Sequence, residues 1–79
     1  MAKENIHVVT GRITVVQEQR FRLVSDGGQG MLFTLARDAS VNAADLHRFH
    51  ERDERVLIEY TGEPNLASGG VHGVRTVER

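Results

Sequence analysis

The chain has 79 residues, a formal net charge of −1 and no cysteine. A chain of this length buries only roughly 60% of its unfolded surface, so little room remains for a substrate cavity beside the core. We therefore expect one domain over residues 1–79 and no catalytic activity. The absence of thiols excludes disulfides and thiolate metal sites. The near balance of charge argues against the strongly basic surface of many nucleic-acid-binding proteins.

The beginning of the chain indicates where the protein resides. No apolar run of signal-peptide length follows Met1 to Asn5, and no stretch approaches the roughly 18 apolar residues that a membrane span needs. We expect a cytoplasmic protein without a membrane partner. Lys3 is the only lysine, and all other cations are arginine. Arginine suits bidentate contacts to phosphate, although a bias in genome composition would give the same preference.

Residues 6–16 are rich in β-branched side chains and predict a long first strand. The apolar residues of this strand change parity around Gly11. A glycine at a slip of the period is typical of a β-bulge or a sharp bend. A long strand with such a bend is what a small closed barrel needs.

The next two strands are predicted to form a hairpin. Residues 21–24 and 31–35 both alternate apolar with other residues, and residues 25–30 between them carry the strongest turn signal of the chain. Asp26 and Gly27 are expected to supply the positive φ angles of a tight hairpin. The same glycine-rich segment lacks the Gly-Lys-Ser/Thr ending of a phosphate-binding loop, so we interpret it as a turn.

Residues 42–55 predict a surface helix of about three turns. Asn42 is a favourable N-cap, and Asp45 three residues later completes a capping box. The remaining charges of the segment are spaced to pair with one another along the helix. Its narrow apolar stripe is expected to cover one end of the domain, through Val41, Leu46 and Phe49.

Two strands follow the predicted helix. Residues 56–60 predict the fourth strand, and residues 62–65 predict a loop because Pro64 cannot continue a central strand. Residues 71–77 predict the fifth strand, with Gly73 as a second bend. This order predicts an all-β fold, a five-stranded OB-fold-like barrel with one short helix between strands 3 and 4. An open sheet fits less well because it leaves exposed edges.

Discontinuous patches over about half of the chain carry a family resemblance. They are Met1-Ala2-Lys3-Glu4 with Ile6, then Gly11, Phe21-Arg22-Leu23, Asp26-Gly27, Asp53, Val56, Glu59, Leu66, Gly70 and Arg75. These patches resemble bacterial translation initiation factor one, a minimal OB domain of the S1 RNA-binding type. The resemblance implies an OB fold and single-stranded RNA or the ribosome as a partner. The chain departs from that family in being slightly acidic and in having the capped helix.

Five residues are candidates for contacting nucleic acid. OB-folds bind oligonucleotides on the face of strands two and three, through phosphate contacts and stacking. The candidates are Arg12, Arg20, Arg22, Arg75 and Tyr60. The alternative is that these arginines only solvate the surface. The three phenylalanines are in phase with apolar neighbours and are expected in the core: Phe21, Phe33 and Phe49.

The remaining motifs predict no metal, cofactor or catalytic site. His47 and His50 stand at i, i+3 on the predicted helix, but no zinc-motif spacing is present, so a solvated helix face is expected. We therefore expect a small nucleic-acid-binding module, with RNA preferred over DNA. The alternative is a protein-interaction or self-assembling module, such as a homodimer. The charge balance and the apolar run of residues 56–58 favour that alternative.

Overall fold

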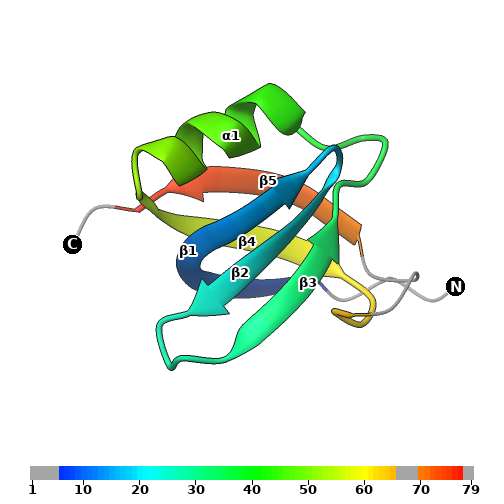
Figure 1. The fold of residues 1–79 in the computed structure, drawn as a ribbon. Coiled ribbons are helices and arrows are strands. Elements are labelled where there is room, and N and C mark those ends of the chain that lie inside the picture. The colour runs from blue at the N-terminus through cyan, green and yellow to red at the C-terminus, as the bar shows by residue number, and fades with distance from the viewer. Residues whose placement is uncertain (1–5, 66–69, 78–79) are drawn as a thin grey trace, which may run out of the picture.

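The computed structural model describes residues 6–65 and 70–77. Five antiparallel strands form one sheet in the order β3-β2-β1-β4-β5, and a single short helix lies between β3 and β4 (Figure 1). The parts of the family resemblance that fall on residues 1–4 and on Leu66 lie outside the described residues. The elements are β1 His7–Gln17, β2 Arg20–Ser25, β3 Gly30–Thr34, α1 Ala43–Glu51, β4 Arg55–Thr61 and β5 Gly70–Thr76.

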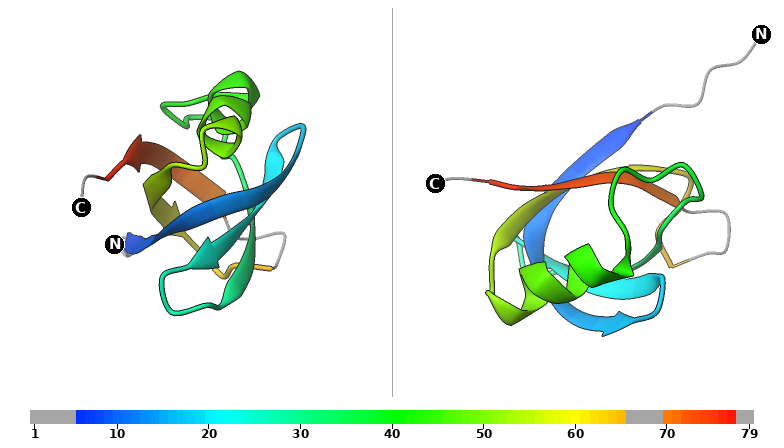
Figure 2. Two further views of the ribbon diagram at one scale, coloured as in Figure 1. Left: turned by 60° about the vertical axis from the view of Figure 1, so that its left-hand side comes forward. Right: turned by 90° about the horizontal axis from the view of Figure 1, so that it is seen from above.

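The sheet coils around its own core (Figure 2). Strand β1 is shared by both halves, because its first residues pair with β4 and its later residues pair with β2. The two outer strands meet where the chain leaves β3, at one parallel bridge between Leu35 and Val71. The Ala36 N–H donates to the Val71 carbonyl at 2.9 Å beside this bridge. In the described part of the chain this contact is a single bridge rather than a ladder, so the sheet is not closed by paired strands.

The irregularity predicted at Gly11 lies three residues further along. The β1–β2 register is continuous at Gly11 and shifts between Ile13 and Val15, which leaves Thr14 without a partner in that ladder. Gly11 therefore does not form the bulge but has another structural role. A Cβ at this position would lie 2.2 Å from the Val24 carbonyl oxygen, so the glycine allows β2 to approach β1 closely.

The second predicted irregularity is found beside Gly73. Glu59 pairs with Gly73 but Tyr60 pairs with Val71, so the β4–β5 register shifts and His72 is the additional residue. His72 Nδ1 lies 2.8 Å from Asp38 Oδ1, and His72 Nε2 lies 2.9 Å from Thr61 Oγ1. Asp38 lies in the β3–α1 connection and Thr61 lies on β4. The His72 side chain therefore connects that segment to β5 and β4.

The β2–β3 turn is a hairpin, but its positive φ angle falls on Gly28 (91°) and not on Asp26 or Gly27. The Gly28 N–H donates to the Ser25 carbonyl at 2.8 Å, and the Ser25 N–H donates to the Gln29 carbonyl at 2.8 Å. This is the common hairpin in which a tight turn is followed by one left-handed residue. The hydrogen-bonded Ser25 and Gln29 thus enclose a loop of three residues, 26–28, rather than two.

The start of α1 is as predicted. The Asn42 side chain accepts a hydrogen bond from the Asp45 N–H at 3.0 Å, and the Asp45 carboxylate accepts one from the Asn42 N–H at 3.0 Å. Leu46 is fully buried, and Val41 and Phe49 pack against the core. No helix in the described part of the chain is long and apolar enough to cross a membrane.

The helix ends earlier than predicted, at Glu51 instead of position 55. Asp53 adopts a left-handed φ of 52°, the Asp53 N–H donates to the His50 carbonyl and the Glu54 N–H donates to the Phe49 carbonyl. This pair of hydrogen bonds is the Schellman motif that terminates helices. An aspartate occupies the place that glycine usually takes, so the sequence carried no clear stop signal.

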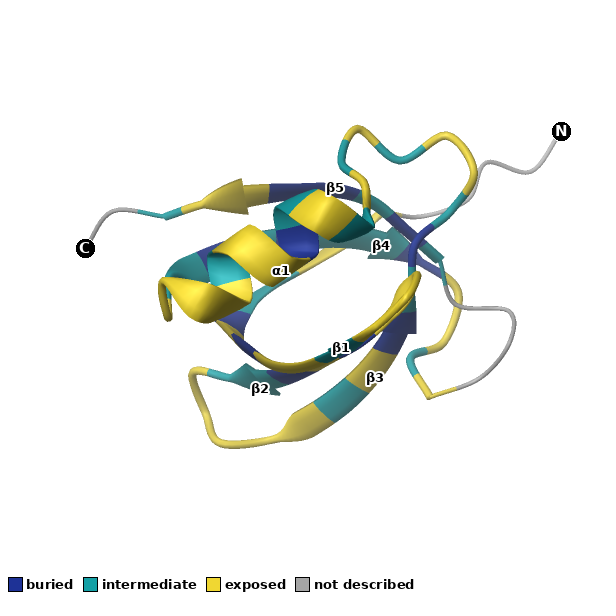
Figure 3. Ribbon diagram, turned by 45° about the horizontal axis from the view of Figure 1, so that its top comes forward, coloured by how far each residue is buried: buried dark blue, intermediate teal, exposed yellow. Residues whose placement is uncertain are grey.

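The core lies inside the coiled sheet and beneath α1 (Figure 3). Phe21 and Phe33 are buried as predicted, with ring centroids 5.6 Å apart, whereas Phe49 is half-buried at the edge. The described residues that form the buried core are Ile13, Phe21, Leu23, Phe33, Leu35, Leu46, Val56, Ile58, Val71 and Val74.

Candidate nucleic-acid interface

Three of the predicted arginines lie on one face of the sheet. Phe21 and Leu23 are buried, so alternation along β2 turns Arg20 and Arg22 outward. Arg12 on β1 pairs with Val24, which shares the outward side of β2 with these arginines. We call this outer surface of β1, β2 and β3 the arginine face. Its exposed side chains include Arg12, Thr14, Val15, Arg20, Arg22 and Leu32.

The charge of this face differs from that of the whole chain. Strands β1, β2 and β3 contain three arginines and neither aspartate nor glutamate. The acidic residues of the described chain lie instead in turns, in the β3–α1 connection, in and after α1, in β4 and in the loop after it. In a chain with a net charge of −1, these three strands thus contribute cationic side chains and no anionic ones.

The side chain of Arg22 is held at the centre of the arginine face. A Cβ on Gly30 would lie 2.3 Å from Arg22 Nη2, so the guanidinium lies directly over this glycine. Arg22 Nη1 is 3.4 Å from Thr14 Oγ1. In the register, Val15 and Leu32 flank Arg22 on either side, with exposed fractions of 46% and 53%. Arg22 therefore forms a cationic centre between two apolar side chains.

Arg12 is less available than Arg20 or Arg22. Arg12 Nη1 donates a hydrogen bond to the Asp53 carbonyl oxygen and lies 3.8 Å from the Asp53 carboxylate. The salt bridges within the described residues include neither Arg20 nor Arg22. Two arginines of the face thus have guanidinium groups without an acidic partner in the described part of the chain.

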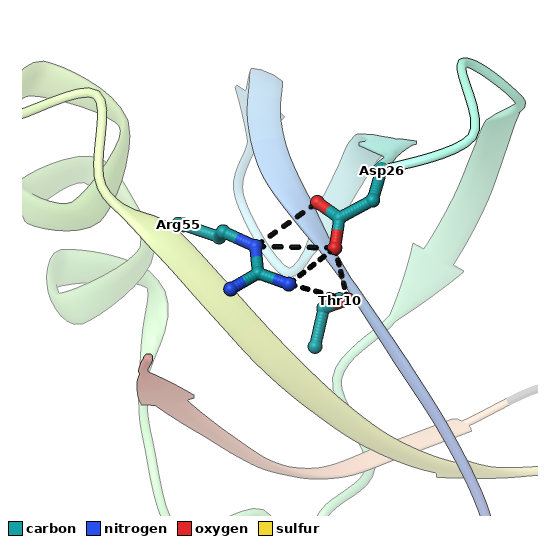
Figure 4. Close-up of polar contacts among 3 residues, drawn as sticks. All are labelled: Thr10, Asp26 and Arg55. Atoms are coloured by element: carbon teal, nitrogen blue, oxygen red, sulfur yellow. Dashed lines mark hydrogen bonds and ion pairs between the residues drawn. The ribbon is translucent and has the colours of Figure 1, made fainter. Parts of the chain in front are cut away.

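An ion pair borders the face at the β2–β3 turn (Figure 4). The Asp26 carboxylate accepts hydrogen bonds from Arg55 Nε at 3.1 Å and from the Thr10 hydroxyl at 2.5 Å. The hydrogen bond from Arg55, with the one from Thr10, lowers the pKa of Asp26 from 3.8 to about 2. The same contact raises the pKa of Arg55. Arg55 was expected to pair with acids of the helix, but the earlier helix end places it on β4 opposite Arg12.

The other two candidates lie elsewhere. Arg75 is on β5, opposite Leu57 of β4, and β4 and β1 separate it from β2 in the sheet order. Tyr60 is half-buried at the end of β4, with ring centroids 5.0 Å from Phe33 and 5.5 Å from His7. The structure therefore does not bring Arg75 or Tyr60 onto the arginine face.

The histidines and acids of the described chain form no group of three or more that would hold a metal ion. His50 Nδ1 lies 2.8 Å from the Ile13 carbonyl oxygen, so this ring connects α1 to β1. His47 is exposed on the helix. The two helix histidines thus differ in environment and are not a shared ligand pair.

Comparisons of this chain with models of protein families, with curated proteins and with solved structures found no match.

Proposed function

We propose that the protein is a small RNA-binding module that binds a single strand on the arginine face. The observation that carries this proposal is the charge segregation of the sheet: β1, β2 and β3 hold three arginines and no acid. Arg20 and Arg22 are two residues apart on one strand, so their side chains leave the backbone about 7 Å apart along β2. That arrangement suits neighbouring phosphates of an extended strand, and Leu32 and Val15 offer apolar contact to the bases.

The proposal includes an OB-like arrangement of the strands. Its supports are the coiled five-stranded sheet, the helix between β3 and β4, and the Leu35–Val71 bridge that brings the outer strands together. In this arrangement the outer surface of β2 and β3 is the oligonucleotide-binding face. The resemblance to initiation factor one adds ribosomal RNA as a source of the strand, with the bacterial cytoplasm as the setting.

The test is a titration of a short mixed-sequence single-stranded RNA, followed by fluorescence anisotropy over a range of salt concentrations. Wild-type binding should weaken with salt because displaced counterions drive it. In the double variant Arg20→Gln/Arg22→Gln, the slope of log affinity against log salt should be shallower by about 1.4, the value for two phosphates of a single strand. DNA of the same sequence tests the preference for RNA.

A matched control carries the same loss of charge away from the face. Arg48 and Arg52 lie on α1 and at its C-cap, where they contact Asp45 and Glu54. The double variant Arg48→Gln/Arg52→Gln should bind RNA as the wild type does. No binding by the wild type at low salt, or an equal loss in this control, would refute the proposal.

A second candidate function is self-association, for which exposed apolar side chains on β1 are the specific observation. Ile6 and Val8 are 66% and 60% exposed, and Leu57 on the neighbouring strand is half-buried on the same outer side as Val8. A dimer formed through these residues should persist at high salt and lose its affinity in the variant Val8→Ser. Sedimentation velocity over a range of protein concentrations distinguishes this function from RNA binding by a monomer.

A further inference from the structure

A depression of about 370 Å³ lies at one end of the arginine face. It is formed between the β1–β2 turn and the β3–α1 connection, two segments that lie side by side (Figure 1). We call it the end pocket. Its lining includes Gln19, Leu35, Arg37, Ala39, Val41 and Ala43.

The end pocket is continuous with the proposed path of the strand. Gln19 immediately precedes Arg20, and its carbonyl accepts a hydrogen bond from the Leu35 N–H at 2.8 Å. Arg20 pairs with Thr34, the residue before Leu35. A strand that runs along β2 from Arg22 to Arg20 is therefore directed toward the segments that form the end pocket.

The lining combines an apolar floor with a polar rim. Leu35 belongs to the buried core, and Ala39 and Val41 pack against that core. The aliphatic atoms of these three side chains form the floor of the pocket. Gln19 and Arg37 are exposed at the rim. This combination fits a flat group with apolar faces and a hydrogen-bonding edge. A carboxamide offers one donor and one acceptor to such an edge, and a guanidinium offers donors to a base or a phosphate.

The other side-chain amide of the lining, that of Asn42, already forms a hydrogen bond within the protein. The Asn42 side-chain oxygen accepts the capping hydrogen bond from the Asp45 N–H at 3.0 Å. The side-chain hydrogen bonds within the described residues include none from the Gln19 carboxamide. The pocket also provides what the arginine face lacks, because the phenylalanines are in or against the core and Tyr60 lies elsewhere. An apolar floor is a substitute for the aromatic platforms on which single-strand binders stack bases.

We propose that the end pocket binds one nucleobase of the RNA strand held on the arginine face, with Gln19 reading the edge of that base. This inference rests on the proposed function and adds a position at which the base, not only the phosphate, is recognised. It predicts a protein that binds single strands and prefers one base at one position.

The experiment compares a short single-stranded RNA with versions in which each base in turn is removed to leave an abasic site. Wild-type protein should lose affinity at one position, by up to the roughly 5- to 150-fold that a base stacked on an aromatic ring contributes. In the variant Ala43→Leu the larger side chain fills the pocket, so removal of that base should have little further effect. In Gln19→Ala the four bases at that position should bind with more similar affinities.

The neighbouring helix residue provides the matched control. Ala44 is exposed and does not line the pocket, so Ala44→Leu makes the same chemical change and should keep the base dependence. Amide NMR spectra establish that each variant is folded. If the intact RNA binds but no position depends on its base, or if Ala43→Leu keeps the dependence, the end pocket is refuted and the arginine face stands. If the intact RNA does not bind, both proposals fail.

Discussion

The close approach of β1 and β2 at Gly11 gives the sharpest test of the structure. In the variant Gly11→Ala the new methyl group would lie 2.2 Å from the Val24 carbonyl oxygen and 2.7 Å from the Ser25 Cα. Both are backbone atoms of the paired strand, so no side-chain rotation relieves the clash. The strands would have to separate by roughly 1 Å, and overpacking of this kind costs about 3 kcal/mol.

An opposing effect is smaller. Replacing glycine by alanine restricts the unfolded chain and stabilises the fold by about 0.4–1 kcal/mol where the native backbone accepts it. The net expectation for Gly11→Ala is a loss of about 2–3 kcal/mol from a total free energy of unfolding on the order of 4–12 kcal/mol. Urea unfolding followed by circular dichroism measures it, and the midpoint should fall by about 2 M for a chain of this size.

Two glycines of the β2–β3 turn serve as controls. A Cβ on Gly27 would have only Ser25 Oγ within 4 Å, at 3.9 Å, and its φ is not positive, so Gly27→Ala should be neutral or slightly stabilising. Gly28 has open space but a φ of 91°, so Gly28→Ala should lose about 1 kcal/mol through backbone strain alone. A Gly11→Ala midpoint equal to that of Gly27→Ala would show that the strands are further apart than described.

Three further predictions concern the helix and the ion pair. Leu46→Ala should lower the free energy of unfolding by about 2–5 kcal/mol, because Leu46 is the one residue of α1 that is fully buried; an unchanged urea midpoint would mean that α1 is not docked. Asp53→Gly should raise it by up to about 1 kcal/mol, because glycine accepts the left-handed φ of 52° that ends the helix; a lower midpoint in thermal unfolding would contradict the Schellman end. Asp26 has a folded pKa of about 2, below the ordinary 3.8, so its contribution is present above pH 3.8 and is lost as the pH falls toward 2. The stabilities of wild type and Asp26→Asn, which weakens the contact with Arg55, should therefore converge between pH 4 and pH 2, and a constant difference across that interval would contradict the pair.

The strands and the helix start were predictable because each is fixed by local chemistry. Alternation placed Phe21 and Leu23 inward, and the Asn42–Asp45 capping box is complete in four residues. The helix end was mispredicted for an equally local reason. Asp53 adopts a left-handed backbone conformation, which glycine usually occupies at a helix end. Because no glycine is present there, the charged sequence after Glu51 predicts a longer helix.

The sequence is sufficient to place two candidate residues on one face only where they share a strand. Arg20 and Arg22 lie on one side of β2 in any register, so the sequence was sufficient to group them. Arg12 joins them only because the bulge at Thr14 sets the β1–β2 register, and Arg75 does not, because β5 pairs with β4. No sequence pattern brings Asp26 to Arg55, since residues 29 positions apart meet there only through the sheet.

The net charge of −1 was the main argument against a nucleic-acid partner. This argument becomes weaker once the positions of the charges are known. Charges more than a Debye length of about 8 Å away are largely screened at physiological salt, so a bound phosphate responds mainly to the arginines beneath it. With Arg12 engaged by Asp53, two arginines of the face remain to contact phosphate, so the face contributes a salt slope of about 1.4. Electrostatics alone would then give only weak binding. Any strong or selective binding must come from contacts that salt does not screen, namely Val15, Leu32 and the end pocket, so its affinity should depend more on the bases than on the salt concentration.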